Sequence, residues 1–196
     1  MKTFLTLFVL FFSSSVVAED ISDFEIEGMS IGDSLLDYFS KTEIQETFYP
    51  NSTKFARTGH MINNGTYEEV RVHYKTNNKF VEKKSSKNFI IYGIGGLIHY
   101  PNNIDACYAK EKEIIKSLET DFPNSEKYVQ GITSHRGDPT GESTYSYTSF
   151  SIEGGAIIIE CTDWSDSATS TKGYVDYLGV MINSNEFIEW LQNEAF

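Results

Sequence analysis

Residues 134–138 bring three chemically useful groups close together in the chain. The segment reads Ser-His-Arg-Gly-Asp, which supplies a hydroxyl, an imidazole and a carboxylate. Hydrolase triads are assembled in space from separate elements, and the nucleophile often sits on a strained turn. No Gly-x-Ser-x-Gly turn occurs in the sequence, and this segment lies in a hydrophilic stretch. We therefore predict a solvated loop here and assign no catalytic residue.

A glycine cluster at residues 93–96 (Gly-Ile-Gly-Gly) invites comparison with dinucleotide-binding turns. That fingerprint needs Gly-x-Gly-x-x-Gly at the opening of a helix, and the third glycine position here is Ile98. The cluster also lies inside an apolar, β-branched run that is typical of a strand. Close backbone packing or a bulge is the favoured interpretation, and no cofactor is predicted.

Potential metal ligands are scattered along the chain. The histidines include no pair at the i, i+4 spacing that places two ligands on one helical face. Glu160, Asp163 and Asp166 gather near the end of a predicted strand, but they lack the alternating acids and the glycine of a calcium loop. We interpret them as a solvated acidic rim and predict no metal site.

The two cysteines, Cys107 and Cys161, allow one intramolecular pairing. They lack Cys-x-x-Cys spacing, and the pattern of each surrounding segment points its cysteine inward. We predict a structural disulfide, which would close a loop of about 55 residues and stabilise the fold by roughly 4 kcal/mol. The alternative is a pair of buried free thiols that pack as small hydrophobes.

Residues 1–18 have the features of a cleavable secretory signal. Lys2 supplies the positive start, residues 4–12 are almost wholly apolar, and Val16 and Ala18 place small side chains before the cleavage point. The apolar core is shorter than the roughly 20 residues that span a bilayer. We predict export to the periplasm or the extracellular space, which favours the disulfide. No membrane insertion is predicted after cleavage.

Residues 19–196 have the length of one domain with a substantial core. The formal net charge of the whole chain is −12. Such a surface repels phosphate backbones and anionic lipid headgroups, so we predict no nucleic-acid partner.

Hydrophobic periodicity predicts several elements. A helix is expected at 31–39, and the longest helix at 103–121, capped by Asn102 or Asn103. Predicted strands cover residues 67–75, 89–100, 145–152, 156–163 and 174–182, the third and fourth forming a hairpin. A last helix follows a cap at Asn183 or Ser184. Residues 50–66, 123–142 and 165–171 are expected to be loops.

This order predicts an α+β domain, with an antiparallel sheet of about five to six strands and helices packed on one face. The order also fits a duplicated helix-then-strands unit, although no repeat of individual residues is visible.

Three segments carry a resemblance to known proteins. Residues 21–36 (ISDFEIEGMSIGDSLL), 102–108 (NNIDACY) and 161–164 (CTDW) resemble an uncharacterised family of small exported bacterial proteins. This resemblance implies no activity. Residues 26–30 (IEGMS) are similar to the entry of small outer-membrane assembly lipoproteins and β-lactamase-inhibitor-like folds, which implies helices on antiparallel strands. The chain lacks the lipidated cysteine of such lipoproteins.

Our leading hypothesis is a non-enzymatic exported protein that binds a protein or a small ligand through a sheet face or a loop surface. The candidate contact residues are exposed aromatics, namely Tyr49, Phe55 and Tyr128. The alternative is a small secreted hydrolase with a spatially assembled site. Its candidate residues are His99 or His135 with Asp105 or Asp138. A third possibility is a structural envelope component without a small ligand.

Overall fold

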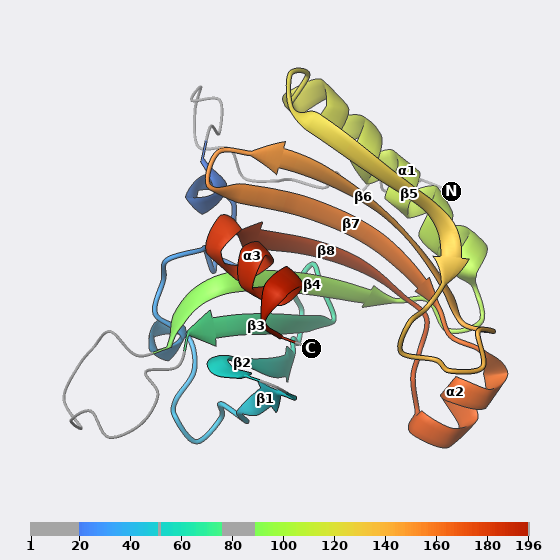
Figure 1. The fold of residues 1–196 in the computed structure, drawn as a ribbon, viewed down its shortest axis with the longest axis horizontal. Helices are drawn as coiled ribbons and strands as arrows, with labels where there is room; N and C mark the ends of the chain where they lie inside the picture. Colours follow the sequence, from blue (N-terminus) through green and yellow to red (C-terminus); the bar gives the residue numbers. More distant parts are fainter. Residues whose placement is uncertain (1–19, 51, 76–88, 196) are drawn as a thin grey trace.

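The computed structural model describes residues 20–50, 52–75 and 89–195. The predicted leader and the charged stretch at 79–88 lie outside the described residues. The described strands form one antiparallel sheet, flanked by helices (Figure 1). The strands are β1 (Thr47–Tyr49), β2 (Ser52–Met61), β3 (Glu69–Lys75), β4 (Ile90–His99), β5 (Glu126–Ser134), β6 (Thr144–Ile152), β7 (Gly155–Asp163) and β8 (Tyr177–Ser184). The helices are α1 (Ile104–Asp121), α2 (Asp166–Lys172) and α3 (Asn185–Asn193), with short 3₁₀ turns at Ile21–Asp23 and Leu35–Asp37.

The sheet is built from two four-stranded meanders. Its strand order is β1-β2-β3-β4-β8-β7-β6-β5, so the last strand of each meander lies at the centre and the first at an edge. The meanders join where β4 pairs with β8, with Ile94 opposite Ile182 and Gly95 opposite Met181. Helix α1 carries the chain from the central β4 to the edge strand β5. This arrangement is symmetric about the join, as a duplicated unit would be.

The predicted number of strands is wrong, because the described residues form eight strands rather than five to six. β2 lies in the predicted loop at 50–66, and β5 lies in the predicted loop at 123–142. β5 is an edge strand with mostly exposed side chains, so it has no apolar alternation to detect. In β2 the neighbouring residues Phe55 and Ala56 are both buried, which also hides the period of two. The predicted loop at 165–171 contains α2, whose N-terminus is capped by the Ser165 hydroxyl.

The helix predicted at 31–39 is also wrong. Only the 3₁₀ turn Leu35–Asp37 forms there. The backbone of this segment bonds to the sheet instead of to itself: the amide of Gly32 donates to the carbonyl of Ile91, and the amide of Ile91 donates to the carbonyl of Asp33. These bonds use the backbone groups that a helix would need, and they lay the N-terminal segment against β4.

One face of the sheet, which we call the closed face, holds the main core. It is covered by α1 and by the N-terminal segment, and buries inward side chains such as Ile94, Ile159 and Leu178. The predicted helix at 103–121 and the predicted hairpin are confirmed within one or two residues at their ends. The predicted disulfide is also confirmed, and it ties Cys107 of α1 to Cys161 of β7 with 6.0 Å between their Cα atoms.

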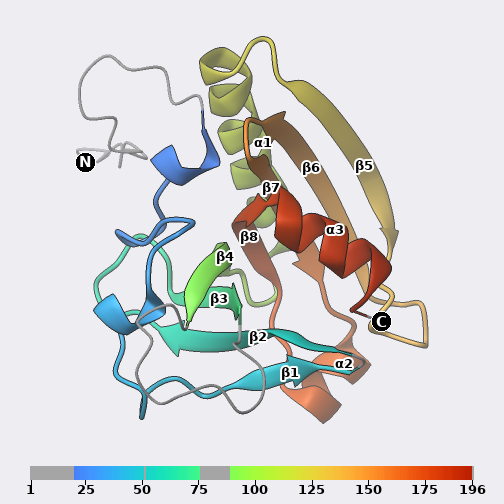
Figure 2. The same ribbon diagram turned by 60° about the vertical axis from the view of Figure 1, so that its left-hand side comes forward.

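The second face carries a helix as well, so the prediction of helices on one face only is wrong. Alternation along β8 points Leu178 and Ile182 to the closed face and Asn183 to the other. A Cβ atom on Gly93, which pairs with Asn183, would lie 3.0 Å from the ring of Phe187 in α3. Helix α3 therefore lies across the sheet from α1, near one end of the strands (Figure 2). Its predicted cap at Ser184 is confirmed, since this hydroxyl accepts the amide of Phe187.

Candidate functional site

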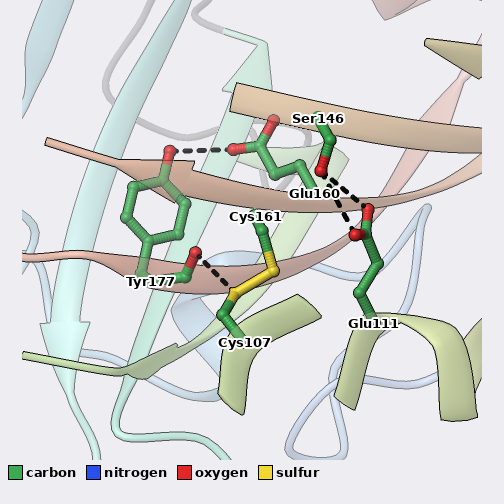
Figure 3. Close-up of a disulfide and its surroundings, with 6 residues drawn as sticks. All are labelled: Cys107, Glu111, Ser146, Glu160, Cys161 and Tyr177. Carbon is green, nitrogen blue, oxygen red and sulfur yellow. Dashed lines mark hydrogen bonds between the residues drawn. A yellow bond between two sulfur atoms is a disulfide. The ribbon is translucent and has the colours of Figure 1, made fainter. Parts of the chain in front are cut away.

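The face opposite α1, which we call the open face, carries the polar residues of the central strands. On β7, Ile159 and Cys161 point to the closed face, so Glu160 and Thr162 point to the open one. Figure 3 shows the disulfide running from α1 to β7, with the side chains of Glu160 and Tyr177 meeting nearby. The period of two that buries the core thus places charged and aromatic side chains on the other side of the same strands.

One end of the open face is filled by α3. Its Phe187 and Trp190 pack on Tyr49 and Phe55, which are 8% and 0% exposed. The prediction that Tyr49 and Phe55 are exposed contact residues is therefore wrong. Glycine makes this packing possible, because a Cβ on Gly93 would also lie 2.6 Å from the side-chain oxygen of Asn183.

The other end of the open face contains a cavity of about 600 Å³. It lies where the ends of β3, β4 and β8 meet the loops after β5 and α2. Its principal polar and aromatic walls are Arg57, Glu69, Arg71, His99, His135, Trp164, Tyr174 and Tyr177. Three glycines, Gly59, Gly137 and Gly173, also line it. A Cβ on Gly137 would lie 2.9 Å from the ring of His135, so glycine allows this ring to pack against the loop.

Paired charges form one wall of the cavity. The Arg71 Nε donates to Glu69 Oε1 at 2.7 Å, and the guanidinium lies 5.3 Å from the ring centroid of Tyr177. His99 lies between two carboxylates, with Nδ1 2.8 Å from Glu68 Oε2 and Nε2 3.7 Å from Glu69 Oε2. The backbone amide of His99 also donates to Glu68 and is the largest cause of the lowered pKa of that carboxyl. The wall thus offers hydrogen-bond donors and acceptors side by side.

Glu160 contacts Tyr177 of this wall without lining the cavity itself. Tyr177 donates its hydroxyl proton to Glu160 Oε1 at 2.8 Å. Burial raises the pKa of Glu160, and the Tyr177 hydrogen bond and the Arg71 charge oppose that rise. Burial also raises the pKa of Tyr177, so its phenol stays neutral. Since Glu160 is not among the residues that line the cavity, it positions Tyr177 and does not face a ligand.

Aromatic rings form the opposite wall. The ring of Trp164 lies 4.4 Å from His135 and 4.4 Å from Tyr174, measured between centroids. Burial lowers the pKa of His135, so its imidazole is neutral near pH 7. This wall brings three adjoining aromatic rings to the cavity.

Two candidate residues of the hydrolase alternative, His135 and Asp138, make their hydrogen bonds within their own loop and to the α2 cap. The Asp138 carboxylate accepts hydrogen bonds from the hydroxyls of Ser143 (2.6 Å) and Thr140 (2.7 Å), which lower its pKa. It also accepts from the hydroxyl of Ser165 at 3.1 Å. His135 Nδ1 accepts from the amide of Gly137 at 3.0 Å. Asp138 therefore organises the loop at 134–143.

A smaller cavity of about 350 Å³ lies at the start of α1, and two of the three residues of the predicted acidic rim line it. Asp163 and Asp166 line it together with Asp105 and Asp176, whereas Glu160 does not. Burial, and then the Asp176 charge, raise the pKa of Asp163. Within the described part of the chain, no group of three or more potential ligands has a geometry that could hold a metal ion.

Sequence reasoning did not identify Glu69, Arg71, Trp164 and Tyr177 as site residues. A signal for two of them existed, because the alternation in residues 69–75 places Glu69 and Arg71 on the exposed side of the strand. The sequence could not predict that this side of β3 borders the same cavity as the loops that carry Trp164 and Tyr174.

No protein family, no curated protein and no solved structure matches this chain. The resemblance to small exported bacterial proteins therefore stays a prediction. Among the described residues, no helix combines the length and the apolar character needed to cross a bilayer.

Proposed function

We propose that this chain is an exported, non-enzymatic binding protein whose ligand occupies the cavity on the open face. The observation that carries the proposal is the cavity itself. Its volume of about 600 Å³ falls within the range of small-ligand sites, which are about 300–1,000 Å³. Such sites combine ring or apolar walls with a few fixed polar groups. The Trp164 wall and the Arg71–Glu69 pair supply these two parts.

Export is supported by two independent features. The leader-like segment at 1–18 is one, and the Cys107–Cys161 disulfide is the other. Disulfides persist in oxidising compartments and are rare where thiols are kept reduced. Both features fit a protein that works in the periplasm or outside the cell.

The charge distribution favours an uncharged, polar ligand. The chain has a net charge of −12, which disfavours phosphate-rich partners. At the cavity, Arg71 is paired with Glu69, and His99 lies next to Glu68. A ligand with one strong charge would have to compete with these pairs, whereas hydroxyl or amide groups can bond to both members.

Two observations weigh against the hydrolase alternative. Both ring nitrogens of His99 face carboxylates rather than a nucleophilic hydroxyl. Asp138 directs its carboxylate to serine and threonine hydroxyls of its own loop and of the α2 cap. A triad needs a base that contacts both a nucleophile and an orienting group.

A thermal-shift screen with small metabolites of several classes (neutral sugars, amino acids, nucleosides and dicarboxylates) tests the proposal. A ligand at about 100 times its Kd adds about 2.7 kcal/mol, which raises the Tm by several degrees in a chain of this length. We expect at least one class to raise the Tm of the protein cleaved after residue 18. Arg71→Gln should abolish that shift, because it removes the charge that orders the cavity wall.

Lys110→Gln is the matched control, since it makes the same charge change on the outer surface of α1, where Lys110 pairs with Glu113. It should keep the full shift. If no class raises the Tm, or if Arg71→Gln keeps the shift, the proposed function is wrong.

A further inference from the structure

Six aromatic rings form a continuous row on the open face, which we call the aromatic row. Its members are Tyr128, Tyr147, Tyr145, His135, Trp164 and Tyr174. The successive centroid distances are 5.7, 6.1, 5.5, 4.4 and 4.4 Å. The last three rings line the cavity, and the first three continue away from it to the edge strand β5.

These rings are not part of the hydrophobic core. Tyr128 is 54% exposed and Tyr174 is 39% exposed, and the four rings between them are partly exposed. The aromatic cluster under α3 provides the contrast, since Phe55 and Trp190 there are 0% and 1% exposed. Exposed contiguous rings leave apolar area in water, and such surfaces mark interaction sites. The row therefore needs a partner that covers ring faces.

Cationic partners fit poorly, because the protein already places its own cations near these rings. The Lys172 ammonium lies 5.4 Å from the centroid of Tyr174, the last ring of the row. In the adjoining cavity, outside the row, the Arg71 guanidinium lies 5.3 Å from the centroid of Tyr177. A ligand cation would meet these charges. Stacked nucleic-acid bases fit poorly too, because they bring phosphates to a chain with a net charge of −12.

We propose that the aromatic row binds a neutral oligosaccharide, with one terminal sugar in the cavity and the following sugars on Tyr145, Tyr147 and Tyr128. This inference rests on the proposed function and adds the ligand class. A sugar ring has an apolar C–H face that packs flat on an aromatic ring. At its edge it has hydroxyls, each of which both donates and accepts. The Arg71–Glu69 pair offers a donor and an acceptor at one place, which suits adjacent hydroxyls.

The length of the aromatic row favours an oligosaccharide over a single sugar as the ligand. The cavity alone would hold a small ligand, and the three tyrosines beyond it would then have no role. A chain that follows the row would contact rings contributed by β5, β6 and the loops that flank the cavity. Affinity should therefore rise with the number of sugars until the row is covered.

Isothermal titration with neutral sugars tests this inference. The probes are maltohexaose, cellohexaose, xylohexaose and hexa-N-acetylchitohexaose, each with its disaccharide, and decaproline represents an aromatic-groove peptide ligand. We expect at least one hexasaccharide to bind more tightly than its disaccharide. Tyr147→Ala and Trp164→Ala should each weaken the hexasaccharide about tenfold, as the loss of one stacking ring would. Circular dichroism confirms that the variants fold.

Val129→Ala is the matched control for Tyr128→Ala. Both side chains are exposed neighbours on β5, at 57% and 54%, but Val129 points to the opposite face. Tyr128→Ala should weaken only the hexasaccharide, and Val129→Ala should change nothing. Binding of decaproline alone, equal binding of disaccharide and hexasaccharide, or row variants without effect would overturn the inference.

These outcomes separate the inference from the proposed function. A disaccharide or another small metabolite that depends on Arg71 but not on Tyr147 would leave the binding cavity in place and refute the oligosaccharide. If no probe of either experiment binds, both proposals fail together.

Discussion

The two faces of the sheet are built from the same strands, but one face is buried core and the other borders a cavity. On the closed face, Ile94, Ile159 and Leu178 are each 0% exposed, and the disulfide fastens α1 over them. On the open face, Glu69, Arg71 and Tyr177 border a cavity. Because side chains alternate along a strand, each central strand contributes to both surfaces at once. The stability of the fold and the proposed binding surface therefore depend on different residues of the same strands.

The open face itself has buried aromatic rings at one end and exposed ones at the other. The rings under α3 are buried, and those of the aromatic row are exposed. Aromatic content alone therefore does not identify the site. The distinguishing feature is whether a helix covers the rings.

Removing the disulfide should have the largest effect on stability. Cys107→Ala with Cys161→Ala opens a loop defined by a sequence separation of 54 residues. In the chain-entropy estimate the loss is about 4 kcal/mol. Urea unfolding measures it, and Trp164→Ala on the open face is the comparison, with an expected loss well below that value. Equal losses for the two variants would contradict the separation of the faces.

Two neighbouring isoleucines of β7 provide a matched pair. Ile159 is 0% exposed on the closed face, whereas Ile158 is partly exposed on the open face. Ile159→Ala should lose about 2–5 kcal/mol, the range for a buried large-to-small change. Ile158→Ala should lose less than half as much, since it creates no sealed cavity. Chemical denaturation of both variants checks this, and similar losses would show that the open face is also core at this position.

The sequence could predict the closed face because burial leaves a pattern. The helix with Cys107 and the hairpin with Cys161 are both amphipathic, and the disulfide follows from their inward positions. β5 leaves no such pattern, since its side chains are exposed and its position is fixed by backbone bonds to β6. The segment before Leu35 has helical spacing, but its backbone bonds to β4 instead.

The candidate site was less predictable for a related reason. Its residues are brought together by the pairing of β3 with β4 and of β4 with β8, and the second pairing places His99 opposite Tyr177, which is distant in sequence. Alternation could place Arg71 on the exposed side of its strand, but it could not place Tyr177 or Trp164 beside it. The site depends on long-range pairing, and local patterns do not encode that.

His73 should make the stability of the α3 end depend on pH. Its Nδ1 lies 2.7 Å from the Tyr49 hydroxyl, and its ring stacks on Phe187. Burial, with the charges of Arg57 and Arg71, lowers its pKa to about 3. The unfolded chain binds this proton near pH 6.5, so stability should fall as the pH drops from about 6.5 toward 3. His73→Gln should flatten that part of the unfolding curve; an unchanged slope would show that other groups cause it.

Glu111 of α1 is a buried carboxylate on the closed face, where a substitution should raise the stability rather than lower it. This carboxylate lies between α1 and the sheet, is 7% exposed, and accepts a hydrogen bond from Ser146 at 3.2 Å (Figure 3). Burial raises its pKa, and the Ser146 bond and the Lys112 charge only partly oppose this. A carboxyl with a raised folded pKa favours the fold when protonated, so its contribution declines as the pH rises past the unfolded value of about 4.3.

Glu111→Gln should therefore stabilise the protein at pH 7. The amide keeps an acceptor for Ser146 and removes the buried charge, and the gain should lie at the low end of the 1–3 kcal/mol that an imperfectly paired buried polar group costs. At pH 4 the gain should shrink, because the wild-type carboxyl is then largely protonated. Lys112→Gln is the informative partner variant, since removing the opposing charge should destabilise the protein slightly at pH 7. A Glu111→Gln variant that is less stable than wild type at pH 7 would mean that α1 needs this charge to dock on the sheet.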